Sequence, residues 1–298
     1  MELFLSIFIL MALGYMFNKF KIFPEQTPLV LNLYIIYVSL PAMVLLHVPK
    51  IVLSLDMFFP IVIPWVITLL GALSILALSN IFHWNKQTTG ALLLVGVLGN
   101  TSFLGIPIVE FYLGTHALPY VMIYDQLGTF LALSTYGGIV IALYSKNGKV
   151  HARTILIKIF TFPPFMALIV AFALSGYTFY PSINTVLSNL ANTLVPVALV
   201  AVGFSLRLKI PKEDLSAFIS GLGVKLILLP SFAFIIAGVF NLEGLAVDVS
   251  ILESGMGPMI TAGAVATIAG LSARLCSAII GYGILFSFLS TYVVAYFL

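Results

Sequence analysis

Charged residues are scarce in this sequence. Only 8% of its 298 residues are Asp, Glu, Lys or Arg, whereas 61% are hydrophobic, and the mean hydropathy is +1.18. No soluble domain of this length could bury so much apolar surface, so the composition predicts an all-α integral membrane protein whose partner and solvent is lipid. The net charge is only +3, and no basic run carries interleaved aromatic residues. Nucleic acid is therefore excluded as a partner.

Cysteine and the signatures of catalysis are equally sparse. The single cysteine, Cys276, cannot form an intramolecular disulfide and has no partner at a metal-ligand spacing. The sequence contains no Gly-x-Ser-x-Gly, His-Glu-x-x-His or phosphate-loop pattern, which argues against an enzyme and against a bound cofactor. Residues 3–17 are apolar but have no preceding basic segment and no cleavage site. They therefore predict a retained first span and not a signal peptide.

Apolar segments of spanning length are abundant. A hydrocarbon core about 30 Å thick needs roughly 20 apolar residues per helix. Ten segments meet this requirement, so we expect ten transmembrane helices. The segments lie at residues 2–18, 27–47, 57–80, 89–114, 117–145, 154–176, 184–207, 215–240, 245–270 and 273–297.

Basic residues gather beside alternate connections between these segments. Eleven lie on one set of connections, Lys50 alone lies on the other set, and Lys225 lies inside a span. Because cytoplasmic loops are enriched in Lys and Arg, we expect a plasma (inner) membrane protein with both termini outside and the loop at residues 145–153 in the cytoplasm. The eleven are Lys19, Lys21, Lys86, Lys146, Lys149, Arg153, Lys158, Arg207, Lys209, Lys212 and Arg274.

The loop at residues 145–153 divides the ten segments into two sets of five. Because five is odd, the second set must be inverted relative to the first. The run Leu-Ser-Thr-Tyr at residues 133–136 recurs at residues 289–292, and Pro41 of the second segment is matched by Pro196 of the seventh. These matches predict an inverted five-plus-five repeat.

Two segments are interrupted by glycine and proline at matched places, residues 99–107 in the fourth and residues 253–258 in the ninth. Glycine and proline are common in membrane helices, but interruptions paired between two halves favour the binding site of a secondary transporter. Each break creates a half-helix N-terminus with free N–H groups and about half a positive charge, which suits a carboxylate. We expect the breaks to meet near the membrane midplane. The expected substrate-binding residues are Asn100, Thr101, Ser102, Gly105, Pro107, Gly255, Met256, Gly257 and Pro258.

Several segments resemble the auxin efflux carrier family of membrane transporters. The matches are residues 31–42 in the second span, 99–107 in the fourth, 194–203 in the seventh and 225–230 in the eighth. The resemblance covers the whole chain and implies a ten-helix fold in which the unwound fourth and ninth spans cross, with transport of organic anions. Residues 253–257 depart from the family pattern and look more like the ninth span of bile acid:sodium symporters, which share this architecture.

The resemblance also implies elevator-type alternating access within a single membrane domain, residues 1–298. Residues 1–50 and 154–209 would form a scaffold. Residues 55–146 and 213–298 would form a moving transport part that carries the site.

Acidic side chains inside spans require a compensating partner. We place Asp125 and Glu253 roughly 11 and 12 Å from the outer face, the depth also expected for Asn100, and Thr129 lies one turn from Asp125. Oxygen ligands at one depth predict a sodium site, which unwound carbonyls near Met256 would complete. Proton coupling through Glu253 or Asp125, and no coupling at all, are the alternatives.

Three further polar residues are candidates for an accessory role: Lys225, Ser39 and Asn192. Lys225 lies about 15 Å from the cytoplasmic end of the eighth span. There it either contacts substrate, extends back to the interface or pairs with a carboxylate.

Two classes of function follow. The first is a secondary carrier of small organic anions, with sodium as the expected coupling ion. The second is a membrane receptor or channel, but no loop is large enough for an output domain, and polar residues cluster at one depth instead of forming a continuous stripe. The carrier is favoured. Substrate identity, direction of transport and oligomeric state, a homodimer included, are left open.

Overall fold

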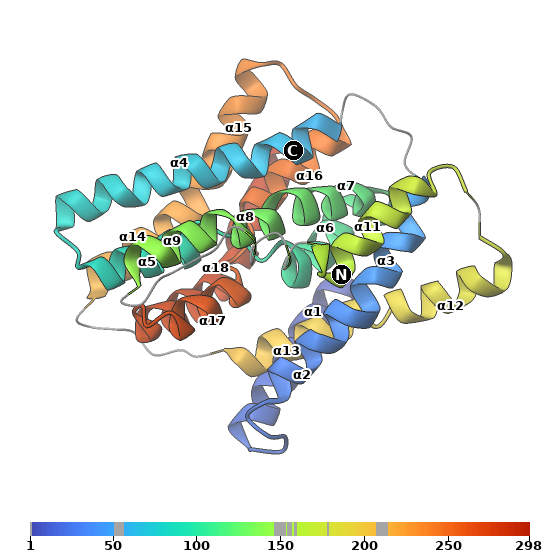
Figure 1. Ribbon diagram of the computed structural model, residues 1–298, viewed down its shortest axis with the longest axis horizontal. Helices are drawn as coiled ribbons and strands as arrows, with labels where there is room; N and C mark the ends of the chain where they lie inside the picture. The colour runs from blue at the N-terminus through green and yellow to red at the C-terminus, as the bar shows by residue number, and fades with distance from the viewer. Residues whose placement is uncertain are drawn as a thin grey trace.

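The computed structural model describes residues 2–50, 57–145, 153, 157, 160–177, 179–206 and 214–298. This part of the chain is built from helices joined by turns and loops, and no strand occurs within it (Figure 1). The expected all-helical class is therefore confirmed for the described residues.

The first half of the chain contains two long helices, α1 and α4, and several short helical pieces that often join end to end into longer rods. In chain order they are α1 (Glu2–Lys19), α2 (Thr27–Tyr34), η1 (Ile35–Ser39), α3 (Leu40–His47), η2 (Val48–Lys50), α4 (Phe58–Phe82), α5 (Lys86–Val95), η4 (Thr101–Gly105), α6 (Ile106–Leu113), η5 (Thr115–Ala117), α7 (Leu118–Ile123), η6 (Tyr124–Phe130), α8 (Leu131–Ser134) and α9 (Tyr136–Tyr144).

The second half likewise combines short helical pieces with one long helix, α18. Its elements are α11 (Pro163–Ala173), α12 (Pro181–Ala191), α13 (Leu194–Ser205), α14 (Leu215–Gly223), η8 (Val224–Leu228), α15 (Leu229–Val239), α16 (Leu245–Ser254), α17 (Ile260–Ile268) and α18 (Ala273–Phe297).

Three rods contain a wide π-helical turn just before a proline. The turns η1, η4 and η8 each lead into an α-helix whose second residue is proline, namely Pro41, Pro107 and Pro230. Proline has no N–H, and its ring clashes with the carbonyl four residues earlier. A turn bonded over five residues relieves that conflict, and the Leu229 N–H accordingly donates to the Val224 carbonyl. At these places the hydrogen-bond pattern changes from four to five residues, and each rod continues as a helix.

Six helical segments in the described part of the chain are long and apolar enough to cross a membrane. They coincide with the second, third, fifth, seventh, eighth and tenth predicted spans: Thr27–His47, Phe58–Phe82, Thr115–Tyr144, Pro181–Ser205, Leu215–Val239 and Ala273–Phe297. Shorter apolar helices occupy parts of the first, fourth and sixth: Leu5–Lys19, Thr101–Leu113 and Pro163–Ala173. The chain is thus a multi-pass helical membrane protein, whereas ten crossings and the inverted repeat stay predictions.

The sidedness of the termini also stays a prediction. Residues 146–152 of the central loop lie outside the described residues. So do six of the eleven basic residues that define the predicted orientation: Lys146, Lys149, Lys158, Arg207, Lys209 and Lys212.

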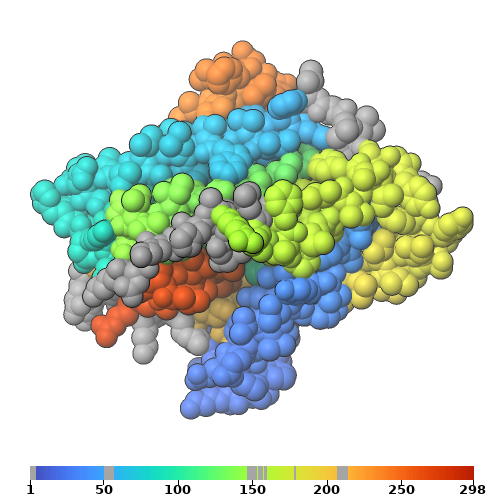
Figure 2. All heavy atoms as spheres, in the orientation of Figure 1, coloured from blue at the N-terminus to red at the C-terminus, as the bar shows by residue number. Residues whose placement is uncertain are grey.

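The helices gather into two groups. α1, α2, α3, α11, α12 and α13 pack mainly on one another, whereas α4 to α9 pack mainly with α14 to α18 (Figure 1). Figure 2 shows one face of the molecule, on which blue atoms lie mostly at the bottom, yellow ones at the right, and cyan, orange and red ones at the top and left. The site described below belongs to the second group.

The first group is held by a close crossing of α1 with α13. A Cβ at Gly14 would overlap the Val200 carbonyl, and a Cβ at Gly203 would overlap the Met11 carbonyl. Apolar side chains gain little from leaving lipid, so membrane helices associate through small residues that let their backbones approach. These two glycines provide that approach.

Candidate functional site at the helix crossing

Two breaks in the helices meet inside the second group. The first lies between the end of α5 at Val95 and the start of η4 at Thr101, and the second lies between the end of α16 and the start of α17. The extended residues Gly99 and Pro258 form an antiparallel bridge. The Asn100 N–H donates to the Gly257 carbonyl at 2.7 Å. The structure interrupts both segments and brings the two interruptions together. The second interruption, at residues 255–259, overlaps the predicted residues 253–258. The first lies at residues 96–100, so only Gly99 and Asn100 of the predicted residues 99–107 are non-helical, and the others belong to η4 and α6.

The crossing is completed by a second backbone bond and by groups from neighbouring helices. The Met259 N–H donates to the Leu98 carbonyl at 3.0 Å. The Ser290 hydroxyl of α18 donates to the Gly255 carbonyl at 3.3 Å. Backbone that leaves the helix at membrane depth must find partners within the protein. These bonds supply partners for both broken segments.

Glycines allow the broken segments to pack closely against the neighbouring helices. A Cβ at Gly257 would come 3.1 Å from the Ile284 Cα of α18, and a Cβ at Gly283 of α18 would overlap the Pro258 ring. A Cβ at Gly99 would come 3.2 Å from the Lys225 ammonium nitrogen. The crossing is therefore packed on both sides without space for side chains at these positions.

Asp125 is held by three side-chain donors. Its Oδ1 accepts from the Thr101 hydroxyl at 2.6 Å and from the Ser102 hydroxyl at 2.5 Å, and its Oδ2 accepts from the Gln126 amide at 2.6 Å. The wide turn η6, which carries Asp125 and Gln126, therefore faces the start of η4. The Thr101 and Ser102 hydroxyls bind this carboxylate in the present conformation.

Glu253, at the end of α16, is a fully buried carboxylate whose two oxygens have no hydrogen-bond partner. It packs against the backbone of η4, because a Cβ at Gly105 would come 2.5 Å from both oxygens. Asp125 and Lys225 are close enough to interact with it electrostatically. A buried carboxylate without hydrogen bonds is costly, so this group is the strongest indication of an incomplete site.

A small internal cavity lies beside Glu253. Its volume is about 10 Å³, close to the space that one water molecule requires. Polar side chains from five elements, α4, η4, η6, η8 and α16, line it: Thr68, Thr101, Tyr124, Thr129, Lys225 and Glu253. The cavity therefore has room for one small guest and oxygen atoms on its walls.

The Lys225 side chain reaches the crossing and not the membrane interface. It is 2% exposed, and its ammonium group donates to the Ser254 carbonyl, the last carbonyl of α16, at 2.8 Å. The snorkelling alternative is therefore wrong. A direct hydrogen bond with Glu253 is also absent, since both Glu253 oxygens lack a partner. The positive charge stabilises the C-terminal end of α16, where the helix dipole is negative.

Comparison with known proteins identifies the kind of protein that carries this crossing. A family model described as membrane transport protein, that of the auxin efflux carrier family, matches residues 1–295. The chain belongs to this family. An uncharacterized transporter of Methanocaldococcus jannaschii is 31% identical over 267 residues, which cover 86% of this chain and 85% of the relative. An uncharacterized transporter of Methanothermobacter thermautotrophicus is 24% identical over 262 residues, which cover 86% and 84%.

The resemblance to the auxin efflux carrier family is thus confirmed, and the protein is a membrane transporter and not an enzyme. Within this carrier, the crossing gathers most of the residues singled out in the sequence. Asn100 is buried, its Oδ1 accepts from the Phe103 N–H at 3.3 Å, and its Nδ2 has no partner. The Met256 N–H donates to the Glu253 carbonyl. Pro107 lies one turn farther along, in the first turn of α6.

Two accessory candidates lie elsewhere. The Ser39 hydroxyl is hydrogen-bonded to the Thr193 hydroxyl at 2.8 Å, which joins η1 to the turn before α13. Asn192 lies in the same turn, next to Thr193. Both belong to the first helix group, although α13 contacts η4 of the second. The Ser39 bond accounts for a structural role of that residue between η1 and α13.

Four residues of the site are not among those expected from the sequence: Thr68, Tyr124, Gln126 and Ser290. Gln126 could have been found, because a buried amide beside Asp125 is unusual inside a span. Ser290 lies within the repeated Leu-Ser-Thr-Tyr run, which by itself indicates only duplication.

Proposed function

We propose that this auxin efflux carrier family member is a secondary active transporter of small organic anions, working by alternating access and coupled to sodium. The observation that carries the proposal is the meeting of two broken helices beside a buried carboxylate without partners. Broken helices at mid-membrane are where carriers bind their substrates and coupling ions.

The anion is proposed to bind at the half-helix that begins with Asn100, Thr101 and Ser102. Two features support this. The positive end of the helix dipole lies there, and the buried Asn100 Nδ2 is a donor without a partner. The Lys225 ammonium adds a positive charge on the other side of Gly99. A carboxylate would satisfy these groups better than a neutral solute.

Sodium is proposed to bind in the cavity beside Glu253. A hard cation prefers oxygen ligands, and the cavity offers the Thr129 hydroxyl and the Glu253 carboxylate. Asp125 and Asn100 complete the proposed set by rotation of their side chains, with carbonyls near Met256. A sodium ion there would supply the partner that the Glu253 oxygens lack.

Proton coupling is the second candidate, and the same residue favours it. A protonated Glu253 would be neutral and would need no cation beside it, which suits its full burial. In that case Glu253 would lose and gain a proton during each cycle. Uncoupled transport, with Glu253 permanently protonated, is the third.

The division of the helices supports an elevator-type cycle. We propose that the group containing α1, α2, α3 and α11 to α13 is the scaffold, and that α4 to α9 with α14 to α18 move as the transport part. The chief contacts between the groups are those of α13 with η4, α3 with α7, α1 with α6 and α11 with η6. Ten spans in an inverted repeat, with both termini outside, complete the proposal.

Uptake by the purified protein in liposomes tests this function. A set of labelled carboxylates is offered under separately imposed sodium, proton and voltage gradients. For a transported carboxylate we expect uptake to rise with an inward sodium gradient at fixed pH. Glu253→Gln should abolish that rise, because it removes the charge that compensates the cation.

Glu110→Gln is the matched control, since Glu110 is a half-buried acid at the end of the same broken span and away from the crossing. It should retain the response to sodium. Uptake that is indifferent to sodium but steep in pH would replace sodium by the proton. Uptake of no carboxylate under any gradient would overturn the proposed substrate class.

A further inference from the structure

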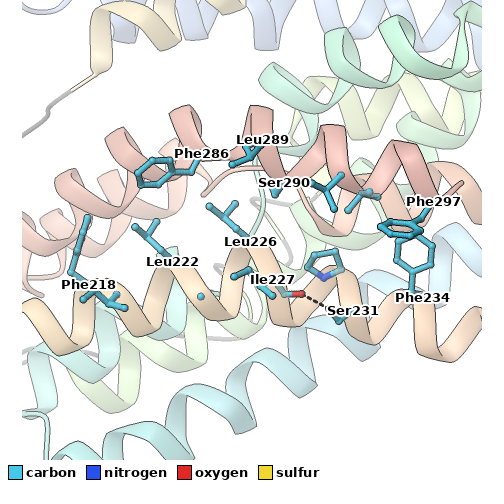
Figure 3. Close-up of a pocket in the computed structure, with 15 residues that line it drawn as sticks. Phe218, Leu222, Leu226, Ile227, Ser231, Phe234, Phe286, Leu289, Ser290 and Phe297 are labelled. Carbon is cyan, nitrogen blue, oxygen red and sulfur yellow. Dashed lines mark hydrogen bonds between the residues drawn. The ribbon is translucent and has the colours of Figure 1, made fainter.

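A long apolar groove runs between two membrane-spanning rods behind the crossing. One wall is the rod α14–η8–α15, and the other is α18 (Figure 3). The groove has a volume of about 680 Å³, within the range of small-molecule sites. Its lining runs from Phe218 to Phe234 on the first rod, about 24 Å at 1.5 Å per residue. Half the thickness of the hydrocarbon core is about 15 Å, and the groove is longer than this.

The groove has a buried floor and a rim exposed at the surface of the protein. Leu222 and Leu226 on the floor are 9% and 6% exposed, whereas Ile227 and Leu289 on the rim are 69% and 66% exposed. Both walls belong to segments of membrane-spanning length. The groove therefore opens sideways into the hydrocarbon of the bilayer and not into water.

The few polar groups of the lining are already hydrogen-bonded. The Ser231 hydroxyl donates to the Ile227 carbonyl, the bond drawn in Figure 3, and the Ser290 hydroxyl donates to the Gly255 carbonyl. Neither hydroxyl proton is therefore free to bind a polar solute. The walls favour a flexible chain of methylene groups, which binds by burying apolar surface.

We propose that this groove is a binding site for one acyl chain of a bilayer phospholipid, which enters from the side. The groove has vacant space where the chain would lie, since Gly223 on its wall has no atom within 4 Å of an added Cβ. The acyl chain would lie directly behind the crossing, because Pro230 and Val294 line the groove and lie 3.5 and 3.6 Å from where a Cβ at Gly255 would be. The site is separate from the anion and ion sites, and its occupant packs against the residues that support the break in α16.

Photolabelling in a bilayer tests the proposal on the wild-type protein. The probe is a phosphatidylcholine with a diazirine in one acyl chain, mixed into liposomes or nanodiscs with unlabelled phosphatidylcholine. Adducts are mapped by mass spectrometry on α14 to α15 and α18, and on the exposed face of α4 for comparison. A binding site saturates as the mole fraction of probe increases, whereas contact with bulk lipid increases in proportion. We expect saturation in the groove and proportional labelling on α4.

Gly223→Trp fills the groove and should reduce groove labelling by about tenfold, with α4 labelling unchanged. Gly238→Trp is the matched control, because Gly238 lies on the same rod, also has open space around it and does not line the groove. It should label as wild type. Proportional labelling of the groove in the wild type, or full groove labelling in Gly223→Trp, overturns the proposal.

A second copy of this chain is the competing occupant. If two chains pack through the groove, Leu289→Cys should cross-link between chains in a Cys276→Ser background, and the groove should take up no probe. That outcome also overturns the acyl-chain site. None of these readouts depends on transport, so the inference stands or falls independently of the proposed function.

Discussion

At the scale of single residues, the two buried carboxylates differ in what surrounds them. Asp125 accepts three hydrogen bonds, whereas the Glu253 oxygens accept none. The side-chain N–H of Gln126 donates to Asp125, whereas its side-chain carbonyl oxygen has no hydrogen-bond partner. A turn of that amide would let it accept a hydrogen bond from an asparagine at position 125. This detail separates a structural role of Asp125 from an ionic one.

We predict that Asp125→Asn folds like the wild type, because all three partners keep a hydrogen bond. Asp125→Leu leaves three donors unpaired and should lower the free energy of unfolding by about 1–3 kcal/mol for each. Thermal unfolding in detergent measures both. If Asp125 also belongs to the sodium site, the stable Asn variant should lose the sodium dependence of uptake. Equal destabilisation by Asn and Leu would contradict the hydrogen-bonding account.

We also predict that Gly105→Ala disables the site. Its Cβ would lie 2.5 Å from both Glu253 oxygens, so either the carboxylate or η4 must shift, and overpacking of this kind costs about 1–3 kcal/mol. Substrate affinity should fall, as measured by binding to the purified protein. Gly238→Ala, with no atom near its Cβ, should bind as wild type. Unchanged affinity in Gly105→Ala would show that Glu253 is not held against η4.

The depth of residues in the membrane could be estimated from the sequence, and this brought Asn100, Asp125, Thr129 and Glu253 into one region. Counting residues along a helix needs only the rise per residue. The direction of each side chain could not be obtained in this way. The sequence therefore missed that Thr101 and Ser102 donate to Asp125, and that the flexible Lys225 side chain binds a backbone carbonyl at the crossing.

At the scale of elements, glycine and proline indicated which two segments are broken, but the first break lies at residues 96–100 and not over the predicted residues 99–107. Residues 96–100 and 255–259 are non-helical because buried backbone can leave a helix where glycines allow close packing and other groups supply hydrogen bonds. The π-helical turns were not predicted. A proline inside a span can kink, end or widen a helix, and only tertiary packing selects among these outcomes.

A disulfide across the crossing tests the meeting of the two breaks. Leu98 and Met259 are joined by a backbone hydrogen bond, so cysteines at these two positions in a Cys276→Ser background should oxidise to a disulfide in native membranes. Peptide mapping identifies the product. Leu98→Cys paired with Gly238→Cys is the negative control, since Gly238 lies at the exposed end of α15. Equal yields from both pairs would show that the breaks do not meet.

At the scale of the whole molecule, composition established the membrane class, and the family comparison established transport. Hydrophobicity locates spans because each must satisfy its own backbone in lipid. It cannot say how the spans associate, because lipid is as apolar as leucine and association depends on small contacts such as those of Gly14 and Gly203. The packing of the helices into two groups is therefore seen in the structure and could not be obtained from the positions of the apolar segments.

The central claim is that a carboxylate binds at the crossing and is carried between the two sides. Protection of a cysteine at position 102, in a Cys276→Ser background, tests this most directly. Ser102 lies at the start of η4 and is partly exposed. Its cysteine should react with a membrane-impermeant thiol reagent added to either side of the membrane, and a transported carboxylate should slow the reaction from both sides. A cysteine at the exposed position Lys86 should react at the same rate with or without that carboxylate. Reaction from one side only, or a rate that the carboxylate leaves unchanged, would contradict the account.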